Sequence, residues 1–184
     1  MIKLIATDID GTLVKDGTLI IDPEYMTVIS KLIDKGIIFT VCSGRQFSSE
    51  QKLFAPIKDK LMYITDGGTV VRTPDRILKT YPMSNELWKD MCRMVRDELP
   101  ACDYFAASPD LCYAEDGASP IFHRLRDSYG FEMREIDDLT KLENDDIIKF
   151  TVYHPDSCEE LCSPHFIPAW KDKAHVTSAG KEWV

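Results

Sequence analysis

The chain has 184 residues, 44% of them apolar, and a formal net charge of −9 at pH 7. This length allows one domain or two small ones, with enough apolar residues to bury a core. An acidic chain without basic runs is a poor candidate for binding nucleic acid or an anionic membrane. No apolar stretch approaches the roughly 20 residues of a membrane span. We therefore expect no nucleic-acid or membrane partner.

The N-terminus and the cysteines indicate a compartment. Acidic residues follow Met1 too soon for a signal peptide, so we expect a cytoplasmic protein. In that compartment the six cysteines are expected to be reduced thiols and not a disulfide framework.

The first half of the chain reads as alternating strands and helices. Apolar, partly β-branched runs predict buried strands over residues 3–7, 37–42 and 61–65. A helix is predicted to begin after the N-cap Asp22 and to end at Gly36, and a short second helix is predicted over residues 48–54. Short links between these elements predict a parallel α/β sheet.

The second half has a different pattern. Helical spacing predicts helices over residues 85–99 and 120–129, and β-branched residues predict a strand over 147–153. The last residues resemble a hairpin, 174–178 paired with 182–184. We therefore divide the chain into an α/β core, residues 1–80, and a smaller α+β domain, residues 81–184.

The run Asp8-Ile9-Asp10-Gly11-Thr12-Leu13 follows the first predicted strand, at the end where open α/β sheets bind ligands. Strand alternation puts Asp8 and Asp10 on the same side. One carboxylate can attack phosphorus and the other can exchange a proton with the leaving oxygen. Hard oxygen ligands of this kind suit Mg²⁺, and Gly11 permits a sharp turn close to a ligand. The alternative is an ordinary solvated acidic turn.

A second polar group, Ser43-Gly44-Arg45, directly follows the strand over residues 37–42. Its hydroxyl and free backbone N–H groups can hold phosphate oxygens. A simple turn is the alternative for this run taken alone. Two such runs at the same ends of neighbouring parallel strands favour a shared phosphate site.

These two runs resemble the first and second signatures of the haloacid dehalogenase-like phosphatases. The turn Asp66-Gly67-Gly68 resembles the one before the cap in the Cof-type subgroup, whose cap is of the C2 type. The resemblance implies a partial Rossmann-like core, a cap that sets specificity, and a Mg²⁺-dependent phosphomonoester hydrolase. The implied substrate is a small phosphorylated metabolite such as a sugar phosphate.

The resemblance also assigns roles to residues. Asp8 is implied as the nucleophile and Asp10 as the general acid/base. Mg²⁺ is implied to bind the Asp8 carboxylate and the Asp10 main-chain carbonyl. Phosphate is implied to bind Ser43 and the N–H groups of the glycines, Gly11 and Gly44. Arg45 is expected equally to touch the substrate or to pair with an acid.

The family also needs a later Lys and a later Gly-Asp pair, and this sequence has no Gly-Asp dipeptide. We therefore expect a member that is truncated after its cap. The alternative function is a catalytically impaired fragment that binds or assembles without turnover. Its first strand would be a bare edge, so we expect poor stability, or a homo-oligomer formed through that edge or through the uncovered sheet face.

A last candidate is a zinc site. His154, Cys158, Cys162 and His165 fall close together, although their spacing matches no standard zinc finger. The alternative places both cysteines on the buried face of a short helix.

Overall fold

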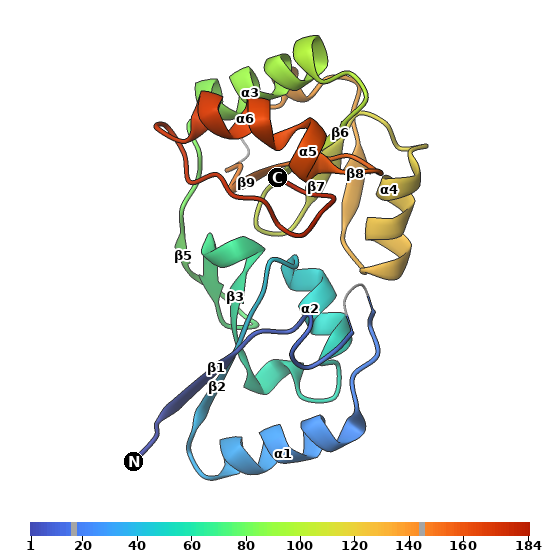
Figure 1. Ribbon diagram of the computed structural model, residues 1–184. Coiled ribbons are helices and arrows are strands. Elements are labelled where there is room, and N and C mark those ends of the chain that lie inside the picture. The colour runs from blue at the N-terminus through green and yellow to red at the C-terminus, as the bar shows by residue number, and fades with distance from the viewer. Residues whose placement is uncertain (16–17, 144–145) are drawn as a thin grey trace.

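The computed structural model describes residues 1–15, 18–143 and 146–184. Its strands form a five-stranded sheet, in the order β1-β2-β3-β4-β5, and a four-stranded sheet, in the order β8-β7-β6-β9. Figure 1 shows the first sheet and its helices in blue to green below, and the second, in green to red, above. The two layers together give the expected mixed α/β class.

The lower sheet begins with three parallel strands, β1 (Leu4–Thr7), β2 (Ile38–Cys42) and β3 (Met62–Thr65). Two helices connect them, α1 (Pro23–Asp34) and α2 (Phe47–Leu53). This is the predicted strand–helix alternation.

Local signals set the ends of α1. The Asp22 carboxylate accepts a hydrogen bond from the Glu24 N–H at 2.9 Å, which caps the first turn. Gly36, just beyond the helix, adopts φ 80°, a left-handed conformation that glycine adopts without steric cost. Both ends therefore lie where the sequence predicts them.

A hairpin that we did not predict completes the lower sheet. It consists of β4 (Val70–Arg72), which pairs antiparallel to β3, and β5 (Ile77–Thr80), which pairs antiparallel to β4. A turn containing Pro74 and Asp75 joins them, and Thr73 N–H donates to the Arg76 carbonyl at 3.0 Å. The Pro-Asp pair between apolar runs is the signal that indicates this turn.

The upper sheet consists of β6 (Asp103–Ala107), β7 (Cys112–Ala114), β8 (Met133–Glu135) and β9 (Lys149–Tyr153). Only β9 was predicted. A second Pro-Asp turn, Pro109-Asp110, joins β6 to β7. These strands are short, and the run 103–107 begins with an acid, which weakens its apolar pattern.

The helices of the upper layer are α3 (Asn85–Glu98), α4 (Pro120–His123), which continues as a π-helical turn over Arg124–Ser128, α5 (Cys158–Leu161) and α6 (Ser163–Trp170). The first two match the predicted helices. The α3 stripe of Trp88, Met91 and Val95 is almost fully buried. No helix in the described part of the chain is long and apolar enough to cross a membrane.

The predicted C-terminal hairpin forms only at its turn, where Ala179 and Trp183 make an antiparallel bridge and Ala179 N–H donates to the Trp183 carbonyl at 3.1 Å. No strand forms over residues 174–178, which the structure describes in full. Instead, the last residues pair with β9: Val152 and Val184 exchange backbone hydrogen bonds of 2.7 and 3.0 Å, and His154 N–H donates to the Glu182 carbonyl. The outer edge of β9 thus provides backbone partners for Glu182 and Val184.

The two faces of the lower sheet differ in burial. Ile5 and Phe39 pack into the core cluster on one face. On the other face Leu4 and Ile38 are register partners, 52% and 47% exposed. Within the described residues β1 pairs only with β2, so it is an edge strand.

Candidate active site

A cavity of about 1030 Å³ lies between the two layers. Its lower wall includes Asp10, the loop Ser43–Gln46 after β2, and the turn after β3. The upper wall is drawn from β6, β9, the segment after α4, and the C-terminal residues. The cavity therefore opens at the carboxyl ends of the parallel strands, where ligands bind open α/β sheets.

The turn after β1 carries Asp8, which is exposed and lies outside the cavity lining. Thr12 donates its hydroxyl to the Asp8 carboxylate at 3.0 Å. Gly11 has φ 78°, as the expected sharp turn requires. Its N–H donates to the Val14 carbonyl at 2.9 Å, so the phosphate contact implied for Gly11 is not available in this conformation.

Asp10 is held by Arg45. Arg45 Nε donates to one carboxylate oxygen at 2.7 Å, and Nη2 donates to the other at 2.6 Å. The Arg45 side chain is 3% exposed and that of Asp10 is 25% exposed. Such a bidentate pair forms with an ionised carboxylate. Of the two roles expected for Arg45, the structure shows the pairing with an acid.

The rest of the Arg45 guanidinium is also engaged. Nη2 donates to the Thr18 carbonyl at 2.8 Å, Nη1 lies 3.4 Å from the Ser49 hydroxyl, and the group lies 5.3 Å from the centre of the Tyr129 ring. Since Tyr129 belongs to the upper layer, Arg45 touches both walls of the cavity.

The loop after β2 is fastened to the turn after β3. Ser43 N–H donates to the Ile64 carbonyl, and the Ser43 hydroxyl accepts from Arg45 N–H at 3.2 Å. Asp66 N–H donates to the Arg45 carbonyl at 2.9 Å, and Gly67 N–H to the Ser43 carbonyl at 3.0 Å. The predicted phosphate loop is thus hydrogen-bonded to the turn after β3 at several points.

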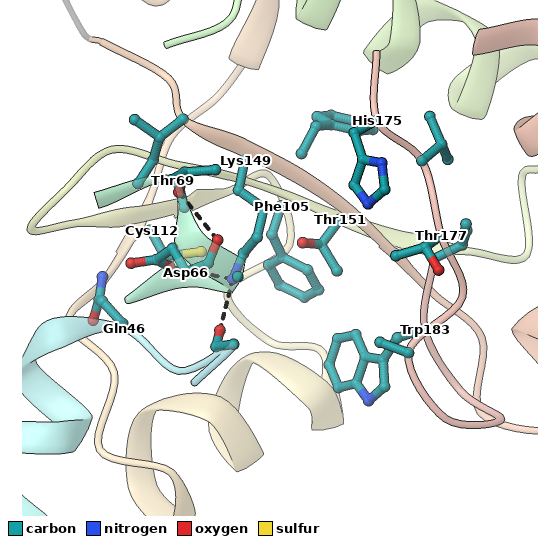
Figure 2. A pocket seen from close by; sticks show the side chains of 18 of the residues that line it. Gln46, Asp66, Thr69, Phe105, Cys112, Lys149, Thr151, His175, Thr177 and Trp183 are labelled. Carbon is teal, nitrogen blue, oxygen red and sulfur yellow. Dashed lines mark hydrogen bonds and ion pairs between the residues drawn. The ribbon is translucent and has the colours of Figure 1, made fainter. Parts of the chain in front are cut away.

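A lysine from the upper layer reaches this unit. Lys149, in β9, donates from Nζ to the Gly44 carbonyl at 2.9 Å and to the Asp66 carboxylate at 3.2 Å (Figure 2). Asp66 is 1% exposed and is the one non-glycine residue in the described part of the chain with positive φ, 54°. Burial raises the pKa of Asp66, while Lys149 and the Thr65 hydroxyl act in the opposite direction.

A second buried carboxyl lies nearby. Glu50, in α2, is fully buried, and neither of its oxygens has a hydrogen-bond partner among the described residues. Burial, and then the charge of Asp66, raise the pKa of Glu50 well above its ordinary value. The pKa of the Cys42 thiol is also raised, by burial and then by Glu50 and Asp8.

The far wall of the cavity is largely apolar. Figure 2 shows Phe105 and Trp183 beside the polar side chains of Thr151, His175 and Thr177. Phe105 and Tyr129 line the cavity, whereas Tyr113 and Phe122 lie outside its lining. This wall therefore provides an apolar surface for the part of a ligand that lies away from Asp10.

The oxygen atoms of Asp8 and Asp10 determine which metal ion the site could bind. Asp8 offers a carboxylate, and Mg²⁺ commonly takes only one or two protein carboxylates, with water and phosphate oxygens as its other ligands. The Asp10 carboxylate is occupied by Arg45, so its contribution would be the main-chain carbonyl. These donors fit Mg²⁺.

The zinc hypothesis is not supported. No group of three or more His, Cys, Asp or Glu residues within 1–15, 18–143 and 146–184 could hold a metal ion. Cys158 and Cys162 are fully buried in the apolar cluster of the upper layer. This is the alternative interpretation of the two cysteines.

Sequence reasoning gave no role to Lys149 or Asp66. The signal for Lys149 is a single charge inside the apolar run 147–153. Such a charge predicts a partner, but the run alone does not say that the partner lies 83 residues away.

Comparisons with known proteins agree with this fold. Residues 5–184 match the family model of the haloacid dehalogenase-like hydrolases. A solved structure from Eubacterium rectale is 80% identical, with a TM-score of 0.86, over 99% of this chain and 69% of that one. The sugar phosphatase BT4131, of HAD subclass IIB, has a TM-score of 0.75 at 16% identity, over 98% of this chain and 68% of its own.

A curated relative is YbjI of Escherichia coli (strain K12), a 5-amino-6-(5-phospho-D-ribitylamino)uracil phosphatase. It is 26% identical over 147 residues, which is 78% of this chain and 52% of YbjI. The chain thus spans about half the length of this relative.

Proposed function

Because the chain belongs to the haloacid dehalogenase-like hydrolases, we propose that it carries the nucleophile and phosphate loop of a phosphomonoester hydrolase. The observation that supports this most directly is the Asp10–Arg45 pair. It joins the acidic turn after β1 to the loop after β2, at the mouth of a cavity between the layers. We propose residues 1–80 as the core and 81–184 as the cap.

In the proposed reaction an Asp8 carboxylate oxygen attacks phosphorus and the ester P–O bond breaks. The leaving oxygen takes a proton from Asp10, which gives a phospho-aspartate and an alcohol. Water then attacks phosphorus, Asp10 takes its proton back, and phosphate leaves. In this structure both Asp10 carboxylate oxygens accept hydrogen bonds from Arg45, so this pair must open and Asp10 must take up a proton before it can act as the acid of the first step.

The groups that bind phosphate are proposed on the loop after β2. The Ser43 hydroxyl can donate to a phosphate oxygen while it accepts from Arg45 N–H. Gly44 N–H is a further donor, and the space around the Gly44 Cα is open, with no atom within 4 Å of where a Cβ would stand. We propose Mg²⁺ as cofactor, held by the Asp8 carboxylate and the Asp10 carbonyl. It would offset the negative charge of the phosphate.

The proposed substrate is a small phosphorylated metabolite with a sugar or sugar-alcohol phosphate. The names of the two relatives support this class, since one is a sugar phosphatase and the other removes phosphate from a ribitylamino compound. The cavity volume fits a molecule of that size. We propose that the reaction takes place in the cytoplasm.

The test is a panel of metabolite phosphates on the whole protein with Mg²⁺, compared with the Asp8→Asn variant. We expect phosphate release from sugar phosphates, and a loss of several orders of magnitude in Asp8→Asn. The variant Asp59→Asn, an exposed acid outside the cavity lining, is the control and should keep full activity. A folded wild type that releases no phosphate from any substrate would refute the proposal.

A second candidate, assembly without turnover, is supported by the lower sheet. β1 is an edge strand within the described residues, and Leu4 and Ile38 expose apolar side chains beside it. Edges of this kind pair with other chains. We propose that the 184-residue chain forms homo-oligomers through this edge.

A further inference from the structure

The contact of Lys149 with the predicted phosphate loop goes beyond the usual pairing of a surface lysine. Its Nζ joins two backbone segments at once, through the Gly44 carbonyl and the Asp66 carboxylate. The Lys149 side chain is 28% exposed, so it is mostly shielded from water, and Asp66 is almost fully buried. Both bonds cross from the upper layer to the lower one.

Charge balance makes this lysine hard to replace. Asp66 and Glu50 are two buried carboxyls, and the charge of Asp66 contributes to the raised pKa of Glu50. Arg45, the other cation close to them, is engaged by Asp10. Without Lys149 the Asp66 carboxylate would be buried with no cation paired to it, an arrangement that is strongly destabilising.

Loss of the Lys149–Asp66 pair should affect the loop Ser43–Arg45, because Asp66 is hydrogen-bonded to that loop. Its N–H donates to the Arg45 carbonyl, and the next N–H, of Gly67, donates to the Ser43 carbonyl. The carboxylate that Lys149 holds is therefore on the residue that fastens the phosphate loop. A shift of Asp66 would therefore disturb the hydrogen bonds to the Arg45 and Ser43 carbonyls.

We propose that Lys149 is a positioning residue, which makes the geometry of the loop Ser43–Arg45 depend on the seating of the upper layer over the lower one. The inference rests on the proposed function only in calling this loop a phosphate site. With the upper layer seated, the ammonium group fixes Asp66 and the Gly44 carbonyl. With the upper layer displaced, Asp66 loses its cation and the loop loses its fastening.

A matched control exists in the same interface. Lys52, in α2, also crosses between the layers, to the Gly130 carbonyl at 2.8 Å and to the Glu132 carboxylate at 2.9 Å. Among the described residues its hydrogen bonds reach Gly130 and Glu132 and not the loop Ser43–Arg45. If Lys149 only attaches the upper layer to the lower one, replacing Lys52 should have the same effect as replacing Lys149. If Lys149 positions the loop, only the replacement of Lys149 should affect it.

The test is hydrogen–deuterium exchange of single amides by NMR, on the 184-residue chain. We expect Lys149→Met to speed exchange at the Asp66 and Gly67 amides at least tenfold, and Lys52→Met to leave them unchanged. Lys149→Arg keeps the charge and should stay close to wild type, which separates the effect from a general loss of folding. Unchanged exchange in Lys149→Met, or equal acceleration in Lys52→Met, would overturn the proposal.

Enzyme kinetics of the whole protein provide a second measurement, in which rescue of kcat/KM by a conservative variant is the informative result. We expect Lys149→Met to lower kcat/KM at least tenfold and Lys149→Arg to restore most of it. If wild type hydrolyses no phosphate ester but Lys149→Met still loosens the Asp66 and Gly67 amides, the proposed function fails and the positioning contact stands.

Discussion

Arg45 holds both carboxylate oxygens of Asp10, at 2.6 and 2.7 Å, across 35 residues of sequence. The pair fixes the turn after β1 against the loop after β2, so two separate runs of the sequence form one site.

Replacing Arg45 by Met should therefore affect stability as well as activity. The variant leaves Asp10 without its cation, and the free energy of unfolding should fall by about 3 kcal/mol, the lower end for a broken buried pair, since Asp10 is partly exposed. Urea denaturation measures this change. Arg126→Met, which breaks the surface pair with Asp127, is the control and should leave the unfolding midpoint unchanged. Equal midpoints for Arg45→Met and wild type would contradict the prediction.

Magnesium binding gives an independent check on Asp8. If the Asp8 carboxylate binds Mg²⁺, millimolar Mg²⁺ should raise the Tm of the chain, because a ligand that binds only the folded state stabilises it. Asp8→Asn should abolish the shift, and the exposed Asp172→Asn should preserve it. The measurement is thermal unfolding with and without chelator, and a shift that persists in Asp8→Asn would show that Mg²⁺ binds elsewhere.

The local parts of this fold could be predicted from the sequence. The three parallel strands and α1 follow from apolar runs, an Asp N-cap and a Gly C-cap, all of which act within a few residues. The hairpin β4–β5 and the strands β6 to β8 were missed because their apolar runs are broken by charged residues, such as Arg72, Asp103 and Arg134, or contain only a few small side chains. Only the turn of the C-terminal hairpin forms, because Glu182 and Val184 pair with β9 and not with residues 174–178.

The site itself was only half predictable. The residue types of Asp8, Asp10 and Ser43 can be read from the sequence, but their partners depend on which strand ends meet. The Asp10–Arg45 pair requires β1 and β2 to be neighbours in register, and the contact between Lys149 and Gly44 spans 105 residues. Such pairings follow from packing of whole elements, which no local pattern encodes.

Glu50 should make stability depend on pH. Its pKa in the folded chain is raised above the ordinary value of 4.5, by burial first and then by Asp66. The folded state therefore keeps a proton that the unfolded state loses above about pH 4.5, so stability falls as pH rises from there towards the raised pKa. The slope from one proton is at most about 1.4 kcal/mol per pH unit.

The variant Glu50→Gln cannot ionise, so its stability should vary less with pH over this range. Urea denaturation in Mg²⁺-free buffer between pH 4.5 and 8 measures the slope. The exposed Glu98→Gln should retain the wild-type slope. If Glu50→Gln and wild type lose stability in parallel, Glu50 ionises in the folded state as it does in the unfolded one.

Self-association through β1 is the last prediction. Leu4 and Ile38 lie side by side on the uncovered sheet face, and the outer edge of β1 has no partner strand among the described residues. We expect the 184-residue chain to form oligomers at micromolar concentration, as measured by light scattering. The double variant Leu4→Lys with Ile38→Lys should shift it towards monomer, because both side chains are about half exposed and charge on an edge strand opposes pairing. Ile20→Lys changes an apolar side chain that is 81% exposed and lies outside the sheet, so it should leave the association as it is. A chain that stays monomeric and unfolds cooperatively at these concentrations would show that this edge does not mediate assembly.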